Sequence, residues 1–101
     1  MIKVPDQTPV LKRYGMQAQM DVAEEECAEL IQAISKMKRY GYDTDRYYHL
    51  VEEIGDVILV LAQLVKMWGI RDDELQDVVD TKYERTLERM RAQEYTCARA
   101  D

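Results

Sequence analysis

Apolar residues recur at steps of three and four along most of this 101-residue chain, and no stretch shows the apolar–polar alternation of a strand. Glycines divide the pattern, because one long segment ends at Gly41 and the next at Gly69. We expect helices over about 16–40, 46–68 and 71–93, and a short helix that begins at Thr8 and Pro9. The pattern therefore predicts an all-α, four-helix bundle-like single domain over residues 1–101, with its core at about 16–93 and peripheral ends.

Charge and cysteine content restrict the class of protein. A net charge of −6 argues against general binding to a nucleic-acid backbone. The two cysteines form no CxxC pair, which argues against a zinc or disulfide framework and favours a reduced, cytoplasmic setting. The N-terminus lacks a signal-peptide core, and the uncharged run 57–65 is too short to cross a bilayer. We therefore expect a cytoplasmic protein without nucleic-acid or membrane partners.

Two predicted helices carry the same arrangement of apolar and acidic residues, in VAEEECAELIQAI (22–34) and HLVEEIGDVILVL (49–61). On a helical wheel each has an apolar stripe that we expect to form the core: Ala23, Cys27, Leu30 and Ile34 on the first, and Leu50, Ile54, Val57 and Leu61 on the second. Two acids three residues apart lie beside each stripe, where they interrupt a second apolar face: Glu26 with Glu29, and Glu53 with Asp56.

A short connection favours antiparallel packing of these two helices, which would bring the two acid pairs face to face. Four carboxylates in a partly dry groove repel one another unless their pKa values rise or a cation neutralises them. Hard divalent cations such as Mg²⁺ take carboxylate oxygens, water and substrate phosphates as ligands. The spacing thus favours a magnesium site for phosphate esters. A solvated acidic face, which is common on helices, is the alternative that spacing leaves open.

The same residues resemble the paired motif of the MazG-like all-α nucleoside triphosphate pyrophosphohydrolases. EEECAEL followed by EEIGDVILVL is similar to the pattern E-E-x-x-E, a variable gap, then E-x-x-D, and the resemblance covers about residues 16–89. It implies a Mg²⁺-dependent enzyme, with Mn²⁺ as a possible substitute, that hydrolyses a nucleoside triphosphate between the α- and β-phosphates. It also implies assembly as a homodimer or a dimer of dimers, which agrees with helices that are apolar on more than one side.

The resemblance assigns roles to individual residues. It implies metal ligands at Glu26, Glu29, Glu53 and Asp56, catalytic roles for Glu25 and Glu26, and phosphate binding by Lys82, Arg85 and Arg89. Two roles stay open for Glu25, which either orients or deprotonates the attacking water or faces solvent. Thr86 stands where some relatives have asparagine, so the preferred base and sugar do not transfer from the family.

Several alternatives stay open at this point. The chain could be a non-catalytic helical dimerisation or regulatory module with solvated acids, or a phosphoribosyl-ATP pyrophosphohydrolase, whose pattern is similar. His49 lies one turn before Glu53 and either touches substrate or is an ordinary packed or exposed histidine. Gly55 lies among the acids of the second helix, where the missing side chain would let a neighbouring helix or a ligand come close.

Overall fold

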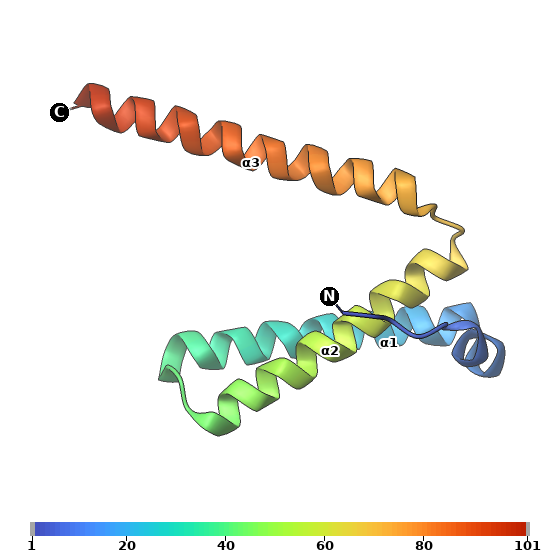
Figure 1. The fold of residues 1–101 in the computed structure, drawn as a ribbon. Coiled ribbons are helices and arrows are strands. Elements are labelled where there is room, and N and C mark those ends of the chain that lie inside the picture. Colours follow the sequence, from blue (N-terminus) through green and yellow to red (C-terminus); the bar gives the residue numbers. More distant parts are fainter. Residues whose placement is uncertain (1, 101) are drawn as a thin grey trace. The chain divides into compact units, whose positions relative to one another are not determined.

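The computed structural model describes residues 2–100, with side chains from 2 to 94. This part of the chain contains three α-helices, α1 (Thr8–Tyr40), α2 (Thr44–Met67) and α3 (Asp72–Ala100), and no strand (Figure 1). The all-α prediction is confirmed. The contacts divide the chain into two compact units, Met1–Gly69 and Ile70–Asp101, which are described separately.

A kink at Gly15 breaks α1 into a short and a long helical piece. Gly15 has φ 87° and ψ 167°, a backbone conformation that residues other than glycine rarely adopt. The predicted short helix therefore exists and is separated from the long one. Its start differs by one residue from the prediction, because Gln7 takes the N-cap position and Thr8 is the first helical residue. The Asp6 carboxylate accepts hydrogen bonds from the Thr8 backbone N–H (3.1 Å) and hydroxyl (2.8 Å).

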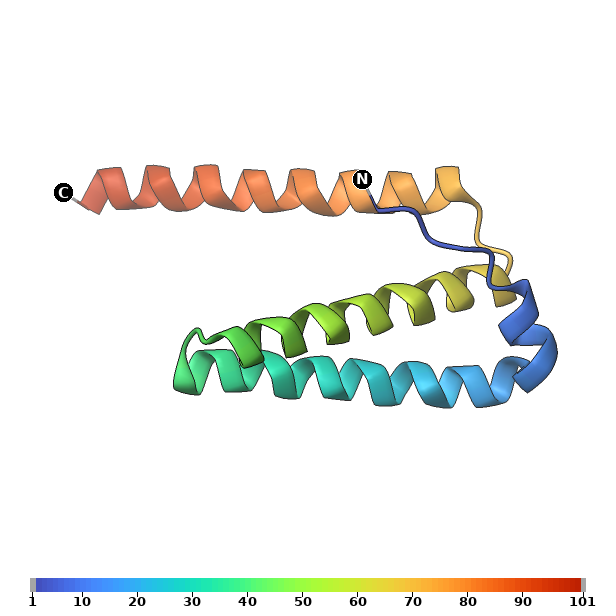
Figure 2. The ribbon, with the colours of Figure 1, turned by 60° about the horizontal axis from the view of Figure 1, so that its bottom comes forward.

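The long part of α1 and α2 form an antiparallel hairpin, as Figures 1 and 2 show. Gly41 ends α1 with φ 77°, and the Asp43 side chain caps α2 by accepting a hydrogen bond from the Arg46 backbone N–H at 2.8 Å. The Arg46 guanidinium also donates to the Gly41 carbonyl at 3.0 Å. These local bonds keep the connection short, and a short connection forces the second helix to return alongside the first.

The buried surface of this hairpin follows the alternating steps of three and four that are typical of a coiled-coil seam. Buried and half-buried residues recur on α1 at Gln19, Ala23, Glu26, Leu30, Ala33 and Met37, and on α2 at Leu50, Glu53, Val57, Val60, Leu64 and Met67. Ala33 is the most buried of the seam residues, at 2% exposure. Small residues such as Ala23 and Ala33 let the two helix backbones come close together. The same seam includes Glu26 and Glu53, so the face that carries the acids is the one that is buried.

The predicted apolar stripe is therefore only partly the core of the hairpin. Cys27 is exposed, Ile34 is 44% exposed and Leu61 is 48% exposed, and Ile54 is exposed as well. The physical reason is that two helices can bury only one face of each against the other. In this chain the buried face is rotated toward Glu26 and Glu53, and part of the more apolar face points outward.

Three buried glutamines connect the N-terminal segment to the hairpin. The Gln19 amide donates to the Gln63 side-chain oxygen at 2.8 Å, and the Gln63 amide donates to the Gln7 side-chain oxygen at 3.0 Å. The Gln7 amide in turn donates to the Pro5 carbonyl at 2.8 Å. All three side chains are buried, so each needs these partners. The network holds residues 5–7 against α2, a contact that the sequence pattern did not indicate.

Replacement of the central glutamine should weaken the fold. Gln63→Leu leaves the Gln19 amide and the Gln7 side-chain oxygen buried without their partner, and we expect a loss of roughly 1–3 kcal/mol in the free energy of unfolding. Urea denaturation followed by circular dichroism measures the loss. The exposed Gln17→Leu on the same hairpin is the matched control, with a change within about 0.5 kcal/mol. Equal stability of the two variants would contradict this role of the network.

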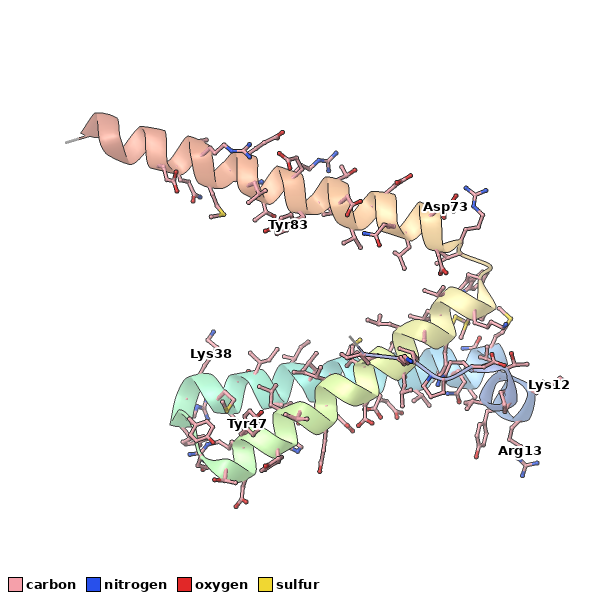
Figure 3. All side chains as sticks on the ribbon, viewed as in Figure 1. Lys12, Arg13, Lys38, Tyr47, Asp73 and Tyr83 are labelled. Carbon is pink, nitrogen blue, oxygen red and sulfur yellow. The ribbon has the colours of Figure 1, made fainter. Side chains whose placement is uncertain are left out.

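The second unit contains α3, which begins with three acids, Asp72, Asp73 and Glu74, in its first turn. Negative side chains stabilise that end of a helix, where backbone N–H groups lack partners. The helix continues past the predicted end at Gln93 to Ala100. Most of its apolar side chains up to residue 94, including Tyr83 at 65%, are exposed, whereas Leu87 is half-buried (Figure 3). None of the helices among residues 2–100 is long and apolar enough to cross a membrane.

Candidate metal centre

The hairpin brings three of the predicted metal ligands together. Glu26 comes from α1, and Glu53 and Asp56 come from successive turns of α2. Each offers one carboxylate oxygen, and these oxygens all lie within 4.8 Å of one another. Glu53 is only 7% exposed, because it occupies a seam position between the two helices. We refer to Glu26, Glu53 and Asp56 as the acidic cluster.

Glu29, the fourth predicted ligand, lies beside the acidic cluster and is itself exposed. Among the neighbouring charges, that of Glu29 has the largest effect on Glu53, and that of Asp56 has the largest effect on Glu26. Each acid of α1 therefore faces an acid of α2, in the crossed order that antiparallel helices produce. This is the arrangement that the duplicated spacing of the two motifs predicts.

The electrostatics of the acidic cluster and the neighbouring Glu29 disfavour four free carboxylates. Burial is the largest cause that raises the pKa of Glu26, followed by the negative charges of Asp56, Glu29 and Glu53. Burial likewise raises the pKa of Glu53, with further contributions from Glu29 and Asp56. His49 acts in the opposite direction when protonated, since its Nε2 lies 3.9 Å from the Glu53 Oε1 atom. The site thus has more negative charge than its surroundings stabilise.

Two oxygens of the cluster have unmet bonding capacity. The Oε2 atoms of Glu26 and Glu53 are buried and have no hydrogen-bond partner among the described residues. A buried polar atom without a partner costs free energy, and more so when it belongs to a charged group. A cation bound by the cluster would supply an interaction that buried carboxylate oxygens of this kind lack. The donors are all carboxylate oxygens, which fit a hard divalent ion such as Mg²⁺.

The remaining predicted site residues lie outside the acidic cluster. Glu25 is exposed on α1, next to Glu26 in the chain. Lys82, Arg85 and Arg89 are exposed and follow one another at steps of three and four on α3, so they share one side of that helix. Because α3 belongs to the second unit, their role as phosphate ligands stays a prediction.

A cavity beside Asp56 is a feature that sequence reasoning missed. The N-terminal segment 2–5 forms one wall, and α2 forms the other with Glu52, Gly55, Asp56, Ile58 and Leu59. The sequence pattern treats this segment as peripheral, because five residues ahead of a helix have no periodicity to interpret. The one available signal was Gly55, a glycine inside a helix and directly next to an acid of the motif.

Comparison with known proteins adds one finding. The family model of the MazG nucleotide pyrophosphohydrolase domain matches residues 15–92. No curated protein and no solved structure gives a significant match. The matched range begins at the Gly15 kink and includes the acidic cluster, Glu29 and the three basic residues of α3. Because the match covers most of the chain, and with it both acidic motifs, the chain belongs to the MazG nucleotide pyrophosphohydrolase domain family.

Proposed function

We propose that the protein is a Mg²⁺-dependent nucleotide pyrophosphohydrolase that cleaves a ribo- or deoxyribonucleoside triphosphate into the monophosphate and pyrophosphate. The observation that carries the proposal is the pair of buried carboxylate oxygens without partners, on Glu26 and Glu53. They lie in a cluster of acids within the range that the family model matches. An acidic cluster that served only as a solvated surface would have no reason to bury these oxygens.

In this proposal the cluster residues and Glu29 hold the cation. When bound, Mg²⁺ offsets the negative charge of the phosphate oxygens and makes a water molecule more acidic. Glu25 and Glu26 are the candidates to orient the water and accept its proton as its oxygen bonds to the α-phosphorus. The bond between the α-phosphorus and the bridging oxygen then breaks, and pyrophosphate leaves. Lys82, Arg85 and Arg89 would bind the phosphates through charge-assisted hydrogen bonds.

Assembly into a homodimer or homotetramer is part of the proposal. The outward face of the hairpin carries large apolar side chains, and Ile31 is 64% exposed. Leu75, Val78, Val79, Tyr83 and Met90 of α3 are exposed as well. Apolar surface of this extent on a small protein is typical of an interface between subunits. A cytoplasmic location fits a nucleotide substrate and the free thiol of Cys27.

The proposed activity can be tested by pyrophosphate release over a panel of ribo- and deoxyribonucleoside triphosphates, with phosphoribosyl-ATP included. We expect equal amounts of monophosphate and pyrophosphate in Mg²⁺, and turnover also in Mn²⁺. Chelation by EDTA should reduce turnover by at least about 100-fold, because the acids alone cannot neutralise the phosphates. Undiminished turnover in EDTA would refute the metal-dependent reaction. If phosphoribosyl-ATP is the only compound hydrolysed, the proposed reaction stands and the proposed substrate is wrong.

A further inference from the structure

We infer that the cavity between the N-terminal segment and α2 receives the nucleoside end of the substrate. The inference rests on the proposed function, because it assigns the part of the nucleotide that the acids do not bind. The cavity is open to solvent, because most of its lining residues are exposed, and it has a volume of about 390 Å³. Pockets for small organic ligands typically measure roughly 300–1,000 Å³, so the space suits one nucleoside.

The cavity lies where the connectivity of a nucleotide requires it. Asp56 belongs to the acidic cluster and also lines the cavity. In a nucleoside triphosphate the α-phosphate, which is the proposed point of attack, is joined directly to the sugar. A ligand with its α-phosphate at the cluster must therefore place its sugar and base within a few ångströms of these acids. The cavity that shares Asp56 meets this condition.

The lining of the cavity has the chemistry of a site for a base and a sugar. Ile2, Val4, Ile58 and Leu59 supply apolar contact for the faces of a planar ring. Ile2 is 70% exposed, so apolar surface in this wall remains in contact with water when the cavity is empty. Lys3 and Glu52 add one hydrogen-bond donor group and one acceptor group that can reach the sugar hydroxyls or the base edge.

Gly55 gives an independent reason to place a ligand in this cavity. Glycine inside a helix destabilises it relative to alanine, so its presence needs a reason. The backbone gives none, because the positive-φ glycines are Gly15, Gly41 and Gly69. Packing gives none either, since a Cβ added at Gly55 would meet no atom within 4 Å. Of the two explanations that the sequence leaves open, close approach of a neighbouring helix has no support among the described residues, and space for a ligand in the cavity remains.

The wall opposite α2 is anchored at its Pro5 end before any ligand binds. The Pro5 carbonyl accepts the hydrogen bond from Gln7, which is itself tied to Gln63 of α2. Asp6 lies 3.9 Å from the Lys66 ammonium group, also on α2. A wall that is ordered in advance loses little conformational entropy on binding, which favours affinity. The glutamine network therefore has a use beyond stability, because it positions the N-terminal segment as part of a binding site.

The test fills the cavity from the wall that α2 forms. Gly55→Leu and Gly55→Ala are compared with the wild type for binding of α,β-imido nucleoside triphosphates in Mg²⁺ by calorimetry, over the four common bases. These analogues bind without being cleaved between the α- and β-phosphates. We expect Gly55→Leu to weaken binding at least about 10-fold and Gly55→Ala by less, because leucine occupies more of the space. Affinity for Mn²⁺ alone should stay within about two-fold, because the cluster oxygens are unchanged.

Two further variants sharpen the experiment. Ala28→Leu adds the same kind of bulk at an exposed position of α1 and should leave binding of the analogues and of Mn²⁺ unchanged. Val4→Glu places a negative charge in the opposite wall and should weaken analogue binding without reducing the affinity for Mn²⁺. Thermal unfolding of the Gly55 variants should occur at or above the wild-type temperature, since each removes a glycine from a helix interior.

Wild-type affinity of Gly55→Leu for every analogue would overturn the inference, and so would the absence of analogue binding by the wild type. Loss of Mn²⁺ binding in Gly55→Leu would also overturn it, because the substitution would then act through the metal ligands. Failure of the proposed function gives a different result from failure of this inference. In that case the wild type binds the analogues but does not release pyrophosphate from the corresponding natural triphosphates.

Discussion

Glu53→Gln should abolish Mg²⁺-dependent pyrophosphate release and at the same time raise the thermal stability of the metal-free protein. Glutamine has nearly the same shape as glutamate but no charge, so the hairpin seam keeps its packing. Loss of one anionic ligand should reduce kcat by at least about 100-fold, since even the outer partners of metal ligands contribute 10–100-fold. Stability should rise because the buried Oε2 atom then no longer belongs to a carboxylate next to Glu29 and Asp56.

Both effects are measurable on one preparation, by pyrophosphate release in Mg²⁺ and by thermal unfolding in EDTA. Glu24→Gln is the matched control, because it removes an equal charge from an exposed position of α1 outside the cluster. It should retain activity and shift the unfolding temperature little. A Glu53→Gln variant with near-normal turnover would exclude Glu53 as a metal ligand. A variant that unfolds at a lower temperature than the wild type would contradict the electrostatic repulsion described for the cluster.

The stability of the metal-free protein should decrease as the pH rises above the ordinary glutamate pKa of 4.5 toward neutrality. The folded-state pKa values of Glu26 and Glu53 are raised above the ordinary 4.5. Folding is therefore favoured by protonation, so this contribution is complete below the unfolded-state pKa and is lost as the pH rises through the folded-state values. Asp6 acts with the opposite sign, because its hydrogen bonds with Thr8 lower its pKa below 3.8. That contribution is lost only in more acidic solution, outside this window.

Magnesium should reverse the loss at the upper end of the window. At a concentration of 100 times its dissociation constant, a ligand of the folded state adds about 2.7 kcal/mol, and about 1 kcal/mol moves the unfolding temperature of a domain this size by roughly 4–8 °C. We therefore expect an increase of about 10 °C or more at pH 7.5, measured by circular dichroism against EDTA. The double variant E26Q/E53Q should show neither the pH dependence nor the response to Mg²⁺. A wild-type profile that is flat in pH and indifferent to Mg²⁺ would contradict both expectations.

The acidic cluster could be predicted from the sequence because it depends on local spacing. Glu26 and Glu29 are three residues apart, as are Glu53 and Asp56, and a short loop returns the second helix along the first. The side of each helix that is buried was predicted less well. Apolar content favoured Ile34 and Leu61, whereas the seam uses the small side chain of Ala33. Hydrophobicity does not reveal how closely two helices approach, and it assigns glutamate to the surface.

The long-range contacts of the N-terminal segment could not be predicted from the sequence, for a different reason. Gln7 and Gln63 are bonded across 56 positions of the chain. A glutamine has no periodic partner that would identify such a pair, and most glutamines are exposed. The cavity beside Asp56 depends on this contact, so it could not be predicted either. The role of the basic residues of α3 still rests on the resemblance of their spacing to the family.

The kink at Gly15 coincides with the first residue of the family match. The family match therefore covers the acids proposed to hold the metal and leaves residues 2–5 outside it. In our proposal, one wall of the nucleoside site thus lies outside the range by which the chain is assigned to its family.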